Sequence, residues 1–253
     1  MAASPASAGF REGRAAFRAG DHETALAEFR QAAGRGHAAS QYFLGLMYRR
    51  GRGVSKDYAE AARWYRMAAE QGHPRAQYWL GVLYRRGQGV TKDMAEAFQW
   101  FRKAGERGNK HAQFWAGRMY QTGKGVERDF EQAVQWYRKS AEQGHAVAQN
   151  NLGYLYDIGK GVREDEAEAR VWYGKAAEQG QPTSQRNLGI LLSEGRGGPE
   201  DLVEGHKWLT ISLTKRPHEE AASVLDSIEK RMTWDEIAEA KKRAEGWRPS
   251  SNR

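Results

Sequence analysis

Histidine is the residue type in this chain best suited to acid–base or metal chemistry, and three of its seven histidines share one repeated position. His37, His73 and His145 are separated by 36 and 72 residues. Catalytic and zinc-binding histidines need partners in the same site, such as a His-x-x-x-His pair on one helical face, and the sequence has no such pair. We therefore expect these histidines to cap helices or to join successive units. We expect no catalytic residue, no metal and no cofactor.

Paired glycines form the second motif that could carry chemistry, because glycine-rich loops cradle phosphates in many proteins. The pairs are Gly51/Gly53, Gly87/Gly89, Gly123/Gly125, Gly159/Gly161 and Gly195/Gly197. None follows a predicted strand, and none is followed by the Lys-Ser/Thr of a phosphate-binding loop. The pairs are therefore expected to be turns between helices.

Composition narrows the classes of protein further. The chain has no cysteine, which excludes disulfides, thiolate nucleophiles and cysteine-ligated metals. Its formal net charge is +8, a balance that is typical of proteins that meet nucleic acids or anionic surfaces. The start, "MAASPASAGFREGR", lacks the apolar core of a secretory signal. We expect a cytoplasmic protein, or a periplasmic or secreted one if a leader has been removed.

An internal repeat organises the chain, and repeats of this length indicate a solenoid. Glycine occurs every 36 residues, at Gly36, Gly72, Gly108, Gly144 and Gly180. Three further residue types recur with the same spacing. Glutamine recurs at Gln41, Gln77, Gln113, Gln149 and Gln185, and an inner glycine recurs at Gly45, Gly81, Gly117, Gly153 and Gly189. Tryptophan recurs at Trp64, Trp100, Trp136, Trp172 and Trp208. Asp57, Asp93, Asp129, Asp165 and Asp201 complete the pattern.

Each repeat is predicted to form two helices, which we call helix A and helix B. In the second repeat, apolar residues at helical spacing predict helix A over about 75–86 and helix B over about 94–106. Asp93 with Glu96 predicts an Asp version of the capping box at helix B. Gly81, inside helix A, predicts a close approach between helices. Because one hairpin cannot bury its apolar face alone, we expect an all-α, right-handed superhelical solenoid of about fourteen helices, with helix A on its concave wall.

The stretch "AQYWLGVLYRRGQGVTKDMAEAFQWFRKA" and its four relatives resemble Sel1-like repeats, which are similar to tetratricopeptide repeats. We expect one solenoid domain over 1–253. It comprises a tetratricopeptide-like unit at 8–35, repeats at 36–71, 72–107, 108–143, 144–179 and 180–215, capping helices at 216–248, and frayed ends at 1–7 and 249–253. In the last part, Thr233 and Glu236 predict a capping box.

The resemblance implies an adaptor that holds other proteins together. A cysteine-rich branch of the family is linked to β-lactam binding and hydrolysis. Because this chain has no cysteine, that activity is not carried over, and a cryptic β-lactamase-like hydrolase is kept only as an alternative.

The repeated residues are interpreted as scaffold: the tryptophans as core and the glutamines as buried hydrogen-bonding groups between helices. The variable residues of helix A are the candidate site, a groove for a protein or peptide. They are Tyr42, Phe43, Arg49, Arg50, Tyr78, Trp79, Arg85, Arg86, Phe114, Trp115, Arg118, Asn151 and Asn187. The resemblance implies Asn at the register of Phe43, Trp79 and Trp115, where a row of Asn can grip a peptide backbone.

Two interpretations of these aromatic residues stay open: they line a groove flanked by arginines, or they fill gaps between neighbouring A helices. With a groove, the expected partner is a protein or peptide that is acidic or has apolar anchors beside acids. The alternative partner is an anionic polymer or membrane surface on the basic ends of the B helices, at Arg66, Arg102/Lys103, Arg138/Lys139 and Lys175. A solvated outer face and the helix dipole explain those cations more simply.

Overall fold

The computed structural model describes residues 5–250, and over this range the chain forms fourteen α-helices and no strand. The expected all-α solenoid of stacked helix hairpins is confirmed, since within each of two compact units hairpins pack on the hairpins next to them in the chain. Residues 1–4 and 251–253, where fraying is expected, lie outside the described residues. The helices fall into two compact units, residues 1–128 and 129–253.

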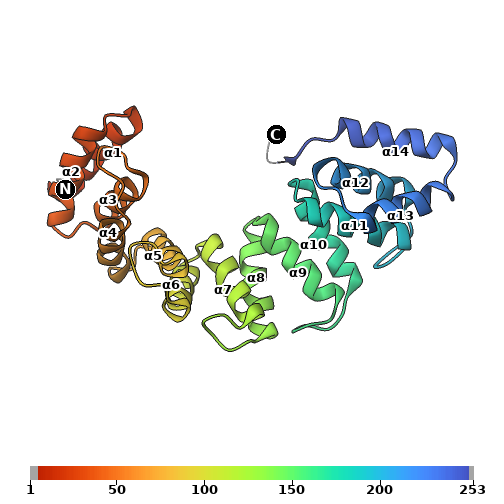
Figure 1. The fold of residues 1–253 in the computed structure, drawn as a ribbon, viewed down its shortest axis with the longest axis horizontal. Helices are drawn as coiled ribbons and strands as arrows, with labels where there is room; N and C mark the ends of the chain where they lie inside the picture. The colour runs from red at the N-terminus through yellow and green to blue at the C-terminus, as the bar shows by residue number, and fades with distance from the viewer. Residues whose placement is uncertain (1–4, 251–253) are drawn as a thin grey trace. The chain divides into compact units, whose positions relative to one another are not determined.

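The first unit contains seven helices (Figure 1). They are α1 (Pro5–Ala19), α2 (His22–Gly34), α3 (Ala38–Arg50), α4 (Tyr58–Glu70), α5 (Pro74–Arg86), α6 (Met94–Glu106) and α7 (Lys110–Thr122). Here α3, α5 and α7 are A helices, and α4 and α6 are B helices. The helix A and helix B of the second repeat, α5 and α6, end and begin where the sequence predicts, to within one residue.

The second unit contains the remaining seven helices. They are α8 (Phe130–Glu142), α9 (Ala146–Asp157), α10 (Glu166–Glu178), α11 (Pro182–Glu194), α12 (Leu202–Lys215), α13 (Glu219–Glu229) and α14 (Trp234–Gly246). Within it, α9 and α11 are A helices, and α8, α10 and α12 are B helices.

The repeated aspartates cap the B helices, but the capping box is incomplete there. In α6 the carboxylate of Asp93 accepts a hydrogen bond from the backbone N–H of Glu96 at 3.0 Å, and the four equivalent aspartates act in the same way. The expected return bond from Glu96 is not formed. Among the described helices, only α14 has both halves of the box, formed by Thr233 and Glu236.

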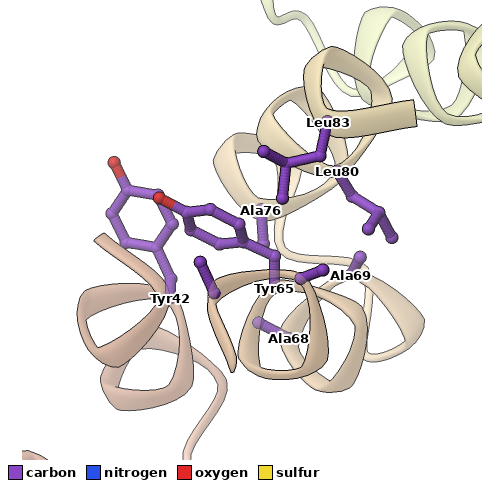
Figure 2. Packing of buried hydrophobic residues seen from close by; sticks show 9 residues of the cluster. Tyr42, Tyr65, Ala68, Ala69, Ala76, Leu80 and Leu83 are labelled. Atoms are coloured by element: carbon purple, nitrogen blue, oxygen red, sulfur yellow. The ribbon is translucent and has the colours of Figure 1, made fainter. Parts of the chain in front are cut away.

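Close approach between the two helices of a hairpin explains the inner glycine. A Cβ atom at Gly45 would lie 2.6 Å from the Tyr65 ring, and one at Gly81 would lie 2.9 Å from the Phe101 ring. Tyr65 and Phe101 are fully buried, and Figure 2 shows Tyr65 at the centre of the cluster that includes Ala68, Ala69, Leu80 and Leu83. The missing side chain therefore makes room for the largest core residue of helix B.

The paired glycines are packing loops. Gly89 has a φ of +69°, and a Cβ there would lie 2.1 Å from the carbonyl of Tyr58, at the start of the preceding helix B. Gly53, Gly125, Gly161 and Gly197 meet the preceding helix B in the same way. The loop therefore joins successive hairpins, as the expected turn does.

Arginine–tyrosine pairs also link successive hairpins. Arg30 of α2 donates to the Tyr48 hydroxyl of α3 at 3.0 Å, and Arg66 of α4 donates to the Tyr84 hydroxyl of α5. Arg138 and Tyr156 form the same link in the second unit. Two of the cations that could have formed an outer anion-binding face, Arg66 and Arg138, are thus already engaged within the solenoid.

Candidate functional site

The A helices of the first unit carry positive charge without any negative charge. No Asp or Glu occurs in α3, α5 or α7, whereas the B helices of that unit contain several glutamates. The charged residues of the three A helices are Arg49, Arg50, Arg75, Arg85, Arg86, Lys110 and Arg118. The candidate residues of these helices, from Tyr42 to Arg118, form what we call the A-helix face.

Arginine and tryptophan stack on one another along this face. The guanidinium carbon of Arg49, on α3, lies 3.8 Å from the Trp79 ring centroid on α5. The guanidinium carbon of Arg85, on α5, lies 4.1 Å from the Trp115 ring centroid on α7, and that of Arg118 lies 5.1 Å from it. A cation–π contact thus joins α3 to α5, and another joins α5 to α7.

Arg85 is the most constrained cation of the face. Its side chain is half-buried, and its buried Nε has no hydrogen-bond partner among the described residues. Burial lowers the pKa of Arg85, and the neighbouring charges of Arg86 and Arg118 lower it further. A cation in such surroundings gains from an added negative charge, because a carboxylate would compensate both the desolvation and the repulsion.

The described carboxylates leave these arginines unpaired. Two ion pairs within the first unit, Glu60 with Arg63 and Glu106 with Arg102, lie on the B helices. Neither Arg49 nor Arg85 forms an ion pair with any described carboxylate, and the same holds for Arg50, Arg86 and Arg118. The nearest polar partner of Arg49 is the Tyr65 hydroxyl, at 3.3 Å from its Nε.

The aromatic candidates of this face are partly packed and partly exposed. Trp79 and Trp115 are half-buried: each packs on a core ring or cluster and also keeps part of its surface exposed. Phe43 is half-buried too; its ring stacks on Phe29 with centroids 4.9 Å apart and also meets Phe10.

Two of the three remaining aromatic candidates are more buried. Tyr42 is 8% exposed and Phe114 is 7% exposed, while Tyr78 is half-buried. Burial raises the pKa of Tyr78. Phe114 therefore contributes little surface of its own, and its ring packs edge to face on Trp115.

The second unit differs at the same register. Asn151 and Asn187 are half-buried, and their side-chain oxygens accept hydrogen bonds from Asn150 and Arg186, both at 3.2 Å. Asp157 replaces the arginine of the first repeats, and it pairs with Arg196 at 2.6 Å. The carboxylates of this unit's A helices, Asp157 and Glu194, both pair with Arg196, whereas the A helices of the first unit have no carboxylate.

The histidines and glutamines have the structural roles that their spacing predicts. Nδ1 of His73 accepts a hydrogen bond from the Ala76 backbone N–H at 3.2 Å and caps α5, and His37 and His145 cap α3 and α9 in the same way. Gln77 is 4% exposed and donates to the Ala69 carbonyl at 3.0 Å, at the end of the preceding helix B. The other four glutamines repeat this bond.

Residues 5–250 contain neither a cluster of potential metal ligands nor a helix able to span a membrane. No group of three or more His, Cys, Asp or Glu side chains is placed to hold a metal ion. In the same part of the chain, none of the helices combines the length and apolar character needed to cross a bilayer.

Sequence analysis missed part of the candidate site. It did not include Arg75 or Lys110, and it did not use the absence of Asp and Glu from the three A helices. That absence is visible in the sequence once the helices are delimited. The lone Nε of Arg85 and the stacking of Arg49 on Trp79 depend on side-chain positions that the repeat pattern does not specify.

Comparisons with known proteins agree with the repeat pattern. The family model described as Sel1 repeat matches residues 38–73, 74–109, 110–145, 146–181 and 182–213. A solved protective antigen of uropathogenic Escherichia coli that displays an SLR fold is 35% identical, with a TM-score of 0.84. The match covers 95% of this chain and 53% of that one, so the chain spans about half the length of that antigen.

A second solved structure, a Sel1 repeat protein from Oxalobacter formigenes, is 32% identical with a TM-score of 0.79, and the match covers 92% of this chain and 97% of that one. No curated protein matches the chain. The repeat register, the fold and these matches agree, and the chain belongs to the Sel1 repeat family.

Proposed function

We propose that this chain, like Sel1 repeat proteins in general, is a scaffold that binds other proteins. It is a non-catalytic adaptor whose A-helix face in the first unit binds an acidic peptide segment of a partner protein. The segment carries apolar or aromatic side chains beside its Asp and Glu residues. Its carboxylates pair with Arg49, Arg85 and Arg118, and its apolar side chains cover the exposed parts of Trp79 and Trp115.

The observation that carries the proposal is the uncompensated charge of Arg85. A half-buried guanidinium with an unpartnered Nε and two like charges nearby is unfavourable in the isolated protein. Stacking on Trp115 holds this group in place, so little side-chain freedom is lost when a carboxylate binds. Arginine and tryptophan are also the residues that most often dominate binding energy at protein interfaces.

The outer face is a weaker candidate for anion binding. Its B helices carry glutamates next to their cations, as in the pairs Glu60–Arg63 and Glu106–Arg102. The cations there also stack on the tryptophans of their own helices, for example Lys103 on Trp100 at 4.5 Å. These cations thus already interact with carboxylates and aromatic rings of the chain itself, so binding of an anionic polymer or membrane to the B helices is not favoured.

A binding measurement with defined peptides tests the proposal. Three fluorescent peptides are compared: one of Asp and Glu with interspersed Trp and Leu, its Asn and Gln isostere, and a Lys and Arg version. We expect the acidic peptide to bind and the other two not to bind at an ionic strength of about 0.15 M. The double variant Arg49→Glu, Arg85→Glu is expected to lose at least about tenfold in affinity.

The matched control is the double variant Arg63→Glu, Arg102→Glu, which makes the same change of charge on the B helices. It is expected to bind as the unchanged protein does. Equal weakening by both double variants would show that only net charge matters, and the proposal would be wrong. Retained helical circular dichroism in all variants ensures that binding, and not folding, has been compared.

A further inference from the structure

A second feature of the first unit is a cavity of about 410 Å³ between α1, α3 and α5. Aromatic side chains line it: Phe10 and Phe17 from α1, and Tyr42 and Phe43 from α3. These rings pack edge to face or tilted against one another, with Phe17 and Phe43 centroids 5.6 Å apart. The cavity therefore has a rigid apolar wall that suits an apolar side chain.

Three arginines surround this apolar wall. Arg14 and Arg18 come from α1 and Arg75 comes from α5, and all three are exposed. No carboxylate lines the cavity, and none of the three arginines forms an ion pair with a described carboxylate. The rim thus presents positive charge that the described chain does not compensate, so it complements a negatively charged ligand.

Two neutral donors complete the lining. Nδ1 of His73 accepts the capping hydrogen bond from Ala76, so the ring carries its proton on Nε2, which has no partner among the described residues. The His73 ring stacks on Tyr42 with centroids 4.8 Å apart. The Tyr42 hydroxyl makes no hydrogen bond to any described residue, and Figure 2 shows it turned away from Leu80 and Ala69.

The apolar wall, the three arginines and the two donors complement the same kind of ligand, one with an apolar centre and acceptor oxygens around it. We propose that the cavity binds one Phe, Trp or Leu side chain of an acidic peptide, with the flanking carboxylates on Arg14, Arg18 and Arg75. The site is distinct in its residues from the stacked arginines of the A-helix face, and it involves α1, which sequence analysis left out of the site. The inference rests on the proposed function, because it assigns the anchor residue of the same class of partner.

The probe is a fluorescein-labelled peptide of Asp and Glu with a single central Phe, and its companion has Ala in place of Phe. Binding to the full chain is measured by fluorescence anisotropy. We expect the Phe peptide to bind at least about tenfold more tightly than the Ala peptide, because only Phe fills the apolar wall.

Two variants act on the cavity in different ways. Ala39→Trp fills it from α3, where Ala39 lines the cavity and is half-buried, and it should abolish the preference for the Phe peptide. Arg75→Glu reverses one rim charge on an exposed side chain, and it should weaken both peptides at least about tenfold. Lys92→Glu, in the exposed loop before α6, is the matched control and should change neither.

The outcomes separate the cavity from the rest of the face. If Ala39→Trp and Arg75→Glu bind like the unchanged protein while Arg85→Glu weakens binding, the cavity inference is overturned and the proposed function stands. If neither peptide binds, or if Arg85→Glu has no effect in addition to Ala39→Trp and Arg75→Glu, then the cavity inference and the proposed function are both overturned. A concentration-dependent dimer that Ala39→Trp dissolves would show a second copy as the occupant and would also overturn the inference. If Ala39→Trp fails to fold, the comparison of peptide binding by Arg75→Glu and by Lys92→Glu decides whether the cavity inference holds.

Discussion

The capping histidines couple the stability of single helix ends to pH. His37 and His73 accept their capping hydrogen bonds through Nδ1, an atom that is an acceptor only in neutral imidazole. Burial lowers the pKa of both rings, and for His73 the charge of Arg75 lowers it further. Asn109 takes the same position before α7, where it accepts from the Ala112 N–H at 3.0 Å without a titrating group.

This arrangement predicts a loss of stability in mild acid. In the unfolded chain histidine takes up a proton near its ordinary pKa of 6.5, whereas the folded rings do so only at lower pH. The free energy of unfolding should therefore be constant above about pH 7 and fall as the pH drops through the range between these two pKa values. Urea unfolding at several pH values measures it.

The double variant His37→Asn, His73→Asn provides the control, because the chain itself uses Asn at this register. It should keep its caps, each worth about 1 kcal/mol, and lose much of the pH dependence. Some dependence remains, since burial also lowers the pKa of His111. An unchanged pH profile in the double variant would refute the capping account.

At the scale of the elements, the loop glycines hold the hairpins at a fixed separation. Gly89→Ala would place a methyl group within 2.1 Å of the Tyr58 carbonyl and should destabilise the protein by several kcal/mol. Gly108→Ala is the matched change, because Gly108 also has a positive φ, of +84°, but has open space around it. It should cost only about 1–2 kcal/mol, the strain of the left-handed conformation.

Denaturant unfolding compares the two glycine variants directly. Equal destabilisation by Gly89→Ala and Gly108→Ala would mean that backbone conformation alone matters. The contact between the loop and the preceding helix would then contribute nothing, contrary to the packing described above.

The elements also show what the sequence could and could not predict. The helices, the Asp caps and the close approach at Gly81 followed from the repeat register, because each depends on residues near one another in the chain. The Arg66–Tyr84 link and the cavity beside α1 did not follow, since both depend on how one hairpin packs on the next. The return bond of the capping box is not formed at Glu96, whereas the equally exposed Glu236 forms it with Thr233, so the spacing of the two residues does not by itself specify this bond.

At the scale of the whole molecule, repeats contact mainly their neighbours, so a local change should stay local. In the second unit, Trp247 closes the carboxyl-terminal end by packing on Trp208 with ring centroids 5.7 Å apart, and Lys215 lies over its ring at 4.5 Å. Trp247→Ala removes this contact and is expected to cost about 2–4 kcal/mol.

Hydrogen exchange checks how far this loss extends. Amides of α12 and α14 should exchange faster in Trp247→Ala, while those of α3 and α5 should keep their protection. Faster exchange in α3 and α5 to the same extent would show one cooperative unit from end to end, against the expectation for stacked repeats.

Charge is also distributed at the scale of the molecule. Positive charge is concentrated on the A helices of the first unit, which have no acidic residue, and it contributes to the net charge of +8. In the second unit, Asp157 and Arg196 form an ion pair. Composition alone predicted only an anionic partner. The location of the charge favours a peptide-sized acidic segment over an extended polymer along the B helices.

The most direct measurement is nuclear magnetic resonance of the indole N–H groups while the acidic peptide is added. Each tryptophan gives its own signal, so the method reports which part of the surface is touched. The account predicts that Trp79 and Trp115 shift, and that Trp100 and Trp136, on the B helices, do not. Shifts at Trp100 and Trp136 with none at Trp79 and Trp115 would contradict the account and place the partner on the opposite row of helices.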